Sequence, residues 1–313
     1  MLRGVAFVSV LDQTPSMSNR IAADETLEAR YFERMAKSLN DKARLLEFLP
    51  PVTDSYAPRV LDVGAGGGEL ADTLSKFGYD VTALDTNRDA LDRITERFPD
   101  VDTLNALANH VTDFNVTFDA IICSSILHEV YSYGDDVHRM GHVSSLGRAL
   151  TAFRAVLNPG GRLLVRDGVK PDDWNKFGFV EVLNDDETAV TDYLRMCPFA
   201  NGDAYGDNGF LLGLSRVGDR KFAGTLRSCM EWSYTYNWSR ESYPREAKEL
   251  YGVLTLDEYA EYVEEFGFTT IHKEAYLLDG YVKGLADKVR LLDADGNERP
   301  WFNSNAIWVY EVN

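Results

Sequence analysis

The sequence of 313 residues predicts an α/β fold on a doubly wound, mostly parallel sheet, and three observations support it. A short apolar strand that begins at Arg59 runs into a glycine-rich turn at 64–68 and then into a helix. A second strand at 81–85 ends in an acid, Asp85. The segment Phe118–Ser124 is an apolar run of the kind buried on both faces of a parallel sheet. Strands that alternate with helices in this way predict a parallel sheet covered on both sides.

Helical patterns flank these strands. A first helix is expected over residues 24–48, ended by Pro50-Pro51. The helix after the glycine turn ends at Gly78, and the next helix begins at Thr86 or Asn87. The apolar positions of the predicted helices, in chain order, are Leu39, Ala43, Leu46 and Phe48; Leu70, Leu74 and Phe77; Leu91, Ile94 and Phe98; and Leu146, Leu150, Phe153 and Leu157.

Two further strands and one further helix complete this part of the pattern. A third strand is expected at 101–107, and the turn Asn158-Pro-Gly-Gly161 leads into a fifth strand at 162–166. Thr255 and Glu258 form a capping box that opens a late helix, which Gly267 ends. The inward positions of that helix are Tyr259, Val263 and Phe266.

The glycine turn and Asp85 together predict a nucleotide-cofactor site. Glycines let the backbone approach a ligand closely, and Asp85 lies 21 positions after Gly64, where an acid can accept hydrogen bonds from both ribose hydroxyls. The acids Asp62 and Glu69 flank the turn. They repel a pyrophosphate but attract the amino group of an amino acid. The P-loop pattern ending in Lys-Ser/Thr is absent.

The segment Leu61-Asp62-Val-Gly64-Ala-Gly66-Gly-Gly68 resembles motif I of the class I S-adenosylmethionine-dependent methyltransferases. The resemblance implies a seven-stranded sheet whose sixth and seventh strands, 269–277 and 306–312, form an antiparallel edge pair. It also implies S-adenosyl-L-methionine as cofactor, with S-adenosyl-L-homocysteine as product. Where this family often carries an acid for the adenine amino group, the chain offers the carbonyl of Asn109. The cofactor residues expected from the resemblance are Asp62, Gly64, Ala65, Gly66, Gly68, Asp85, Thr86, Ala108, Asn109 and Ser124.

The catalytic and substrate-binding candidates are polar residues at the end of the fourth strand (Phe118–Ser124) and of the fifth strand (162–166). In this family the loop after strand four touches both the cofactor and the acceptor. His128 is the first candidate for a general base, because an imidazole titrates near neutral pH; the alternative is a hydrogen-bonded wall of the pocket. Arg166 and Asp167 either bind a charge of the acceptor or form a simple ion pair. The rival catalytic residues are Glu129 and Tyr131, and Tyr133 is a further substrate-binding candidate.

An aromatic-rich insertion is expected after strand five, at 168–254, as a lid for substrate recognition. Its segment 232–238 alternates aromatic with small or polar residues, so a strand there would place all its rings on one face. That face either lines an aromatic pocket or packs as a small core. The candidates for substrate binding are Trp232, Tyr234 and Tyr236. The expected parts of the chain are an N-terminal helical segment (1–50), a cofactor-binding core (51–167), the insertion (168–254) and the C-terminal part of the core sheet (255–313).

The net charge of −18 disfavours a general nucleic-acid binder, because it repels a phosphate backbone at long range. Cationic or neutral substrates fit more easily. The three cysteines form no C-x-x-C pair, and neither a secretion signal nor a membrane span is visible, so the expected location is cytoplasmic. The sequence leaves the oligomeric state open.

The expected function is methyl transfer to an oxygen or nitrogen acceptor, with a small molecule as the favoured substrate. The sequence contains neither the Asn/Asp-Pro-Pro-Tyr/Phe motif of exocyclic-amine DNA methyltransferases nor a Pro-Cys nucleophile after strand four. No metal is expected, because Ser124-Ser125 stand where metal-assisted methylation would want acids. The alternatives are methylation of RNA, a nucleotide or a protein, and a non-catalytic cofactor-binding scaffold that docks a partner through its aromatic insertion.

Overall fold

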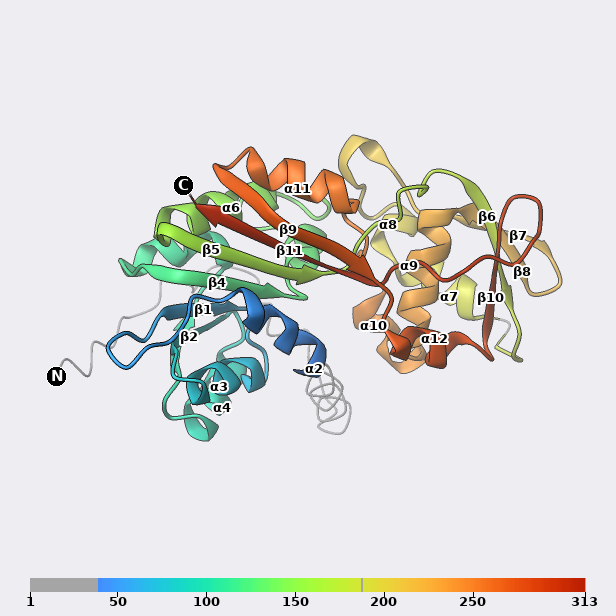
Figure 1. The fold of residues 1–313 in the computed structure, drawn as a ribbon. Coiled ribbons are helices and arrows are strands. Elements are labelled where there is room, and N and C mark those ends of the chain that lie inside the picture. Colours follow the sequence, from blue (N-terminus) through green and yellow to red (C-terminus); the bar gives the residue numbers. More distant parts are fainter. Residues whose placement is uncertain (1–38, 187, 313) are drawn as a thin grey trace.

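The structure, a computed structural model, describes residues 39–186 and 188–312 (Figure 1). Most of the helix predicted at 24–48 lies outside the described residues. Its described end consists of α2 (Leu39–Lys42) and the 3₁₀ helix η2 (Ala43–Phe48). These two elements run along the underside of the core sheet in Figure 1.

A seven-stranded sheet forms the core, in the order β3-β2-β1-β4-β5-β11-β9. Strands β1 to β5 are mutually parallel, and β11 pairs antiparallel with both β5 and β9. The predicted doubly wound sheet with an antiparallel edge pair is therefore confirmed. The strand bounds are β1 Arg59–Val63, β2 Asp80–Asp85, β3 Asp102–Asn105, β4 Phe118–Ser124, β5 Leu157–Asp167, β9 Phe268–Tyr276 and β11 Asn305–Val312.

Helices cover both faces of this sheet, and each face has its own apolar core. On one face η2, α3 and α4 pack on alternate residues of the central strands, such as Val60 and Ile122. On the other face α5, η3, α6 and α11 pack on the intervening residues, such as Leu61 and Val63. This alternation is what a strand buried on both faces requires. The bounds are α3 Glu69–Lys76, α4 Arg88–Arg97, η3 Ala108–Phe114, α5 Leu127–Tyr133, α6 Ser144–Val156 and α11 Leu256–Glu264.

The predicted helix boundaries follow their capping residues. Asn87 accepts hydrogen bonds from the backbone N–H groups of residues 89 and 90 at the start of α4, and Thr255 and Glu258 form the predicted capping box of α11. Gly78 follows α3 with φ +93°, as expected for a helix C-terminus. Two predicted apolar positions are wrong. Phe77 is 62% exposed because α3 has already ended, and Leu157 begins β5 instead of continuing α6.

A second unit lies beyond the carboxyl end of β5, to the right in Figure 1. Its four-stranded sheet has the order β10-β6-β8-β7, with antiparallel pairs throughout. The strand β10 comes from late in the chain, beyond the predicted insertion 168–254. The bounds are β6 Phe177–Val182, α7 Ala189–Met196, α8 Pro198–Asn201, η4 Asp207–Gly209, β7 Leu214–Gly218, β8 Lys221–Thr225, α9 Leu226–Asn237, η5 Arg240–Ser242, α10 Tyr243–Glu246, α12 Asp279–Leu285 and β10 Val289–Leu292.

Helix α9 forms the centre of the second unit, and residues 226–236 are all buried. The segment 232–237 is therefore helical, and the single aromatic face that a strand would have created is absent. The rings of Trp232 and Tyr236, one helical turn apart, stack with their centroids 5.3 Å apart, whereas the ring of Tyr234 packs against Tyr281, so the alternation in sequence does not create one aromatic face.

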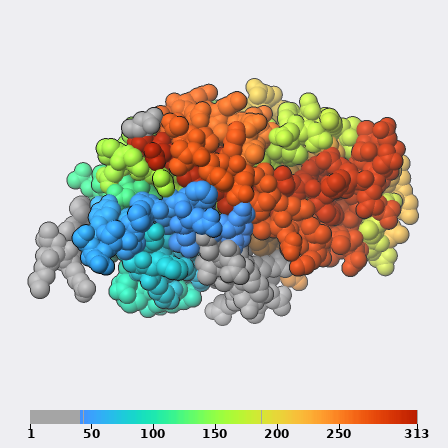
Figure 2. Space-filling model, viewed as in Figure 1, coloured from blue at the N-terminus to red at the C-terminus, as the bar shows by residue number. Residues whose placement is uncertain are grey.

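The last part of the chain joins the two units. Figure 2 shows its orange and red residues extending over one face of the molecule from the core sheet to the second sheet. The elements along this path are α11 and β9 on the core, α12 and β10 on the second unit, and finally β11 back in the core. None of the helices within 39–186 and 188–312 has the length and apolar character needed to cross a membrane.

Candidate active site

The glycine turn between β1 and α3 forms one wall of a first cavity. The backbone is left-handed at Gly64 (φ +69°), Gly66 (φ +54°) and Gly68 (φ +82°). A β-carbon at Gly64 would lie 2.5 Å from Cγ1 of Ile126, so a side chain cannot be placed there without displacing the next wall of the cavity. Gly64 and Gly66 line the cavity, whereas Gly68 packs against α4.

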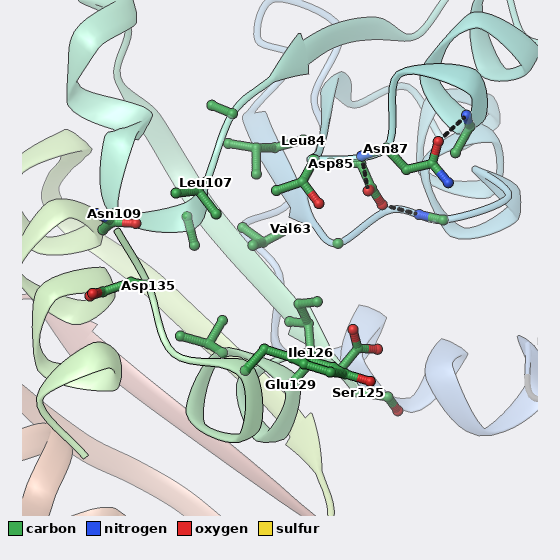
Figure 3. A pocket seen from close by; sticks show the side chains of 18 of the residues that line it. Val63, Leu84, Asp85, Asn87, Leu107, Asn109, Ser125, Ile126, Glu129 and Asp135 are labelled. Atoms are coloured by element: carbon green, nitrogen blue, oxygen red, sulfur yellow. Dashed lines mark hydrogen bonds between the residues drawn. The ribbon is translucent and has the colours of Figure 1, made fainter. Parts of the chain in front are cut away.

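Asp85 ends β2 and faces the glycine turn across the first cavity. Its Oδ2 accepts a hydrogen bond from the backbone N–H of Gly66 at 2.9 Å, and its Oδ1 accepts one from that of Asn87 at 2.8 Å (Figure 3). Burial raises the pKa of Asp85, and these backbone donors oppose the shift. Each carboxylate oxygen has a second lone pair, so Asp85 can still accept hydrogen bonds from a ligand.

The far end of the first cavity is lined by the segment that leads from β3 into η3. Ala108 and Asn109 both line the cavity, together with Thr86, which directly follows β2. The side-chain amide of Asn109 donates to Oδ1 of Asp136 at 2.9 Å. Because Asp136 holds the NH₂ group, the carbonyl oxygen of Asn109 is left to accept a hydrogen bond from an amino group.

Besides Gly68, three of the predicted cofactor residues flank the first cavity without lining it. Ala65 is partly buried in the turn. Ser124 is buried with no hydrogen-bond partner for its Oγ among the described residues, whereas its neighbour Ser125 lines the cavity. Asp62 is only 3% exposed and, within 39–186 and 188–312, its Oδ2 has no hydrogen-bond partner. Burial raises the pKa of Asp62 to about 7, despite the opposing charge of Lys42.

Replacing Asp62 by asparagine is expected to stabilise the ligand-free protein increasingly as the pH rises. Below about pH 4 the folded and unfolded chains both hold this proton, so Asp62 has no effect on stability. Between about pH 4 and 7 only the unfolded chain ionises, so stability falls as the pH rises, and above that range the cost is constant. The gain in unfolding free energy of Asp62→Asn over wild type should grow by roughly 2–3 kcal/mol between about pH 5 and pH 8 in urea titrations.

The control is Asp54→Asn, since Asp54 is exposed. It should change stability equally at both pH values. If the Asp62→Asn difference were also independent of pH, the buried carboxyl would not be the cause.

A second cavity of about 620 Å³ adjoins the first, and Ser125, Glu129 and Glu249 line both. Glu249 lies after α10, so the second unit contributes to the boundary between the two cavities. The second cavity also has three aromatic walls, which come from Trp238, Tyr251 and Tyr281.

His128 lies in the wall of the second cavity and is held between two carboxylates. Its Nδ1 lies 2.6 Å from Oδ1 of Asp167, its backbone N–H donates to Oδ2 of the same residue at 3.1 Å, and its Nε2 lies 3.5 Å from Oε2 of Glu249. Burial lowers the pKa of His128, but Asp167 and Glu249 outweigh that effect and raise it well above its usual value. The ring is 6% exposed and packs against Tyr251.

Glu129 and Tyr133 extend from the same helix, α5, toward Glu249. The hydroxyl of Tyr133 donates to Oε1 of Glu249 at 2.7 Å. Burial raises the pKa of Glu129 to about 8, and the charge of Glu249 adds to the shift. In Figure 3 Glu129 and Ser125 lie on the side of the first cavity that faces Asp85. The cavities therefore meet beside these acidic groups.

The other predicted site residues divide into two groups. Arg166 and Asp167 line the second cavity, and Arg166 pairs with Asp41 and donates to Oγ of Ser125 at 2.6 Å. Tyr131, in contrast, is buried away from both cavities, where its hydroxyl accepts a hydrogen bond from the backbone N–H of Asp207 at 3.4 Å. The residues that line neither cavity are Tyr131, Trp232, Tyr234 and Tyr236.

Sequence reasoning missed the contribution of the second unit to the site. Glu246 and Glu249 lie in or after the short helix α10, and no motif distinguishes them from surface acids. Trp238 and Tyr251 were part of the aromatic density noted in the sequence, but nothing there separated them from the aromatics of the core. The only signal for these residues in the sequence was the high proportion of aromatic residues in the segment 168–254.

Comparisons with known proteins point to one family. A family model described as a methyltransferase domain matches residues 27–273. A ubiquinone biosynthesis O-methyltransferase of Proteus mirabilis is 28% identical over 80 residues, which are 24% of this chain and 33% of that protein. An uncharacterized methyltransferase of Mycobacterium tuberculosis is 32% identical over 107 residues, 34% of this chain and 38% of the relative. The chain thus spans little more than a third of the length of these two relatives.

Solved structures also match parts of this chain. A methyltransferase from Mesorhizobium loti described as S-adenosylmethionine dependent has 15% sequence identity and a TM-score of 0.46. The match covers 86% of this chain and 95% of that one.

Proposed function

The chain belongs to the methyltransferase-domain family with the class I, S-adenosylmethionine-dependent fold, and from this we propose that it methylates an oxygen or nitrogen atom of a small molecule. The observation that carries the proposal is the pair of adjoining cavities, one at the glycine turn and one between the two units. Methyl transfer needs donor and acceptor sites side by side, because the acceptor atom must come into contact with the methyl carbon of the donor.

The first cavity is the proposed site of the cofactor. Asp85 would hold the ribose hydroxyls, Asn109 the adenine amino group, and the turn at Gly64–Gly66 the methionine part. The left-handed glycines and the buried carboxyl of Asp62 beside the turn support this fit. When bound, S-adenosylmethionine supplies a methyl group already activated by its sulfonium charge, so the residues of this chain have to position the acceptor and exclude water.

The second cavity is the proposed site of the acceptor. Its size suits a small molecule, and it combines aromatic walls with polar groups, as small-molecule sites commonly do. Tyr133, Arg166 and Asp167 remain proposed substrate-binding residues, and segment 168–254 a proposed recognition region. The net charge of −18 supports a small molecule over a nucleic acid. A cytoplasmic location is part of the proposal, supported by the three unpaired cysteines.

His128 and Glu129 are the proposed catalytic residues. Both lie where the acceptor would meet the first cavity, and Asp167 fixes the orientation of the imidazole. Their proposed task is to promote loss of the acceptor's proton as the acceptor attacks. Tyr131 is no longer proposed for this role, because its hydroxyl lies beside Asp207 and away from both cavities.

Calorimetry with S-adenosylmethionine and S-adenosylhomocysteine tests the proposal first, with NAD and ATP as controls. The expected result is micromolar binding of the first two ligands alone, followed by methylated products when a panel of small hydroxyl and amine compounds is supplied. Absence of binding would contradict the proposal and favour a scaffold that docks a partner.

A further inference from the structure

Three potential metal-ligating side chains meet where the two cavities adjoin. The ring nitrogen of His128 and one carboxylate oxygen from each of Glu129 and Glu249 all lie within 4.8 Å of one another. Two of these residues come from α5 and the third from the second unit, 120 positions later in the chain. His128 and Glu249 are buried, and Glu129 is partly exposed to both cavities.

The orientation of His128 is fixed by Asp167 from outside this cluster. Asp167 accepts from the backbone N–H groups of His128 and Gly168 and lies 2.6 Å from Nδ1, so the proton on Nδ1 points at Asp167. The other ring nitrogen, Nε2, is then directed toward the two glutamates. Metal-ligating histidines are commonly held by a carboxylate in this way.

The contact between Nε2 of His128 and Oε2 of Glu249 itself requires a positive charge. Without an ion, a second proton on Nε2 supplies this charge between the ring and the carboxylate oxygen 3.5 Å away. A metal ion that displaces this proton takes the same place, because two buried acceptors facing each other are unfavourable unless a proton or a metal ion lies between them. Ligand atoms about 2.1 Å from one metal ion lie roughly 3.0–3.5 Å apart, which matches this separation.

We infer that His128, Glu129 and Glu249 bind a divalent metal ion at the junction of the two cavities. One imidazole nitrogen and two carboxylates suit Mn²⁺, Fe²⁺, Co²⁺ or Zn²⁺ better than Ca²⁺, which takes oxygen ligands alone. Glu129 moves inward to complete the set. The inference departs from the expectation of no metal, which rested only on Ser124-Ser125 in the loop after strand four and could not anticipate Glu249.

The three ligands leave positions of the ion open toward the second cavity. There an oxygen of the acceptor completes the coordination, which orients the acceptor and makes its proton easier to lose. With the ion in place, His128 and Glu129 act on this proton through the metal. This role rests on the proposed function, whereas binding of the ion does not.

The test is titration of the metal-stripped full chain with MnCl₂, followed by calorimetry and by the loss of the free Mn²⁺ signal in electron paramagnetic resonance. The expected result is one Mn²⁺ per chain, bound at least tenfold more weakly in both Glu249→Gln and Glu129→Gln. Asp167→Asn should weaken binding by about 10- to 100-fold, although Asp167 is not a ligand. A second titration, with ZnCl₂, tests whether the site prefers Zn²⁺, the softer ion, to Mn²⁺.

The matched control is Glu246→Gln, because Glu246 is another buried acid of the second cavity but pairs with Arg245 and Tyr251. It should leave Mn²⁺ affinity unchanged. Circular dichroism identifies any variant that fails to fold. If Glu249→Gln fails to fold, the test rests on Glu129→Gln, because Glu129 is the most exposed of the three ligands. The inference is overturned if neither ion binds stoichiometrically, or if binding survives all the ligand substitutions.

Calorimetry with S-adenosylmethionine on the same samples separates this inference from the proposed function. Cofactor binding without metal binding would overturn only the metal site. Metal binding without cofactor binding would leave the metal site standing and contradict the proposed methyl transfer.

Discussion

His128→Ala is expected to lower kcat for methyl transfer by roughly 10²- to 10⁴-fold at saturating cofactor and acceptor. His128 lies in the wall of the second cavity, and its imidazole is held between Asp167 and Glu249. The alanine removes the imidazole, which is proposed to promote loss of the acceptor's proton either directly or as the ligand of a metal ion. Affinity for S-adenosylmethionine should stay within about twofold, because His128 does not line the first cavity.

His142→Ala is the matched control, since His142 lines neither cavity. Its turnover should equal that of the wild type. An undiminished kcat in His128→Ala would remove His128 from the reaction. Asp167→Asn separates positioning from direct action: it keeps the imidazole but weakens its orientation, so the expected loss of kcat is smaller.

Asp85→Ala is expected to weaken binding of S-adenosylmethionine by roughly ten- to a hundredfold, the effect of one or two charge-assisted hydrogen bonds. Part of that loss comes from a change in the cavity wall, because Asp85 also accepts hydrogen bonds from the backbone N–H groups of Gly66 and Asn87. Asp85→Asn keeps one acceptor oxygen and should lose less. Calorimetry with the cofactor and with S-adenosylhomocysteine measures both variants.

Asp80→Ala provides the control for Asp85, because Asp80 is an exposed acid at the opposite end of the same strand, β2. Cofactor affinity should be unchanged there. Equal affinity in Asp85→Ala and wild type would contradict the assignment of the first cavity to a ribose-containing cofactor.

Short sequence patterns predicted the elements whose structure depends on residues close together in the chain. The strand Phe118–Ser124 was predicted with the observed bounds, because a continuous apolar run between polar segments has few other solutions in a parallel sheet. The start of α11 followed from reciprocal hydrogen bonds between Thr255 and Glu258. The glycines at 64, 66 and 68 have the left-handed backbone that favours this residue.

Elements that depend on distant partners could not be predicted in this way. Helix α9 is buried on all sides, so it lacks the one-sided apolar pattern that identifies a helix, and its alternating aromatics imitated a strand. Strand β10 joins the second sheet through pairing with β6, more than 100 residues earlier. The position of Glu249 beside His128 depends on the docking of the two units.

The same limit applies within the candidate site. The part of the site that follows strand ends, such as Asp85 and His128, could be predicted from the sequence because parallel strands bring their carboxyl ends together. The part contributed by the second unit depends on tertiary packing. Tyr131 shows the reverse error: it lies within the predicted loop, but it is buried with its hydroxyl beside Asp207 and lines neither cavity.

The position of β11 between β5 and β9 has a consequence for how the protein folds during synthesis. Residues 305–312 are translated after all the other strands, and β9 has no pairing partner in the core sheet until they emerge. Until then the long edge of β5 stays open, and an open strand edge is a template for pairing with other chains. Completion of the sheet is therefore expected to be a late step in the folding of this domain, and the nascent chain is most prone to aggregation just before it.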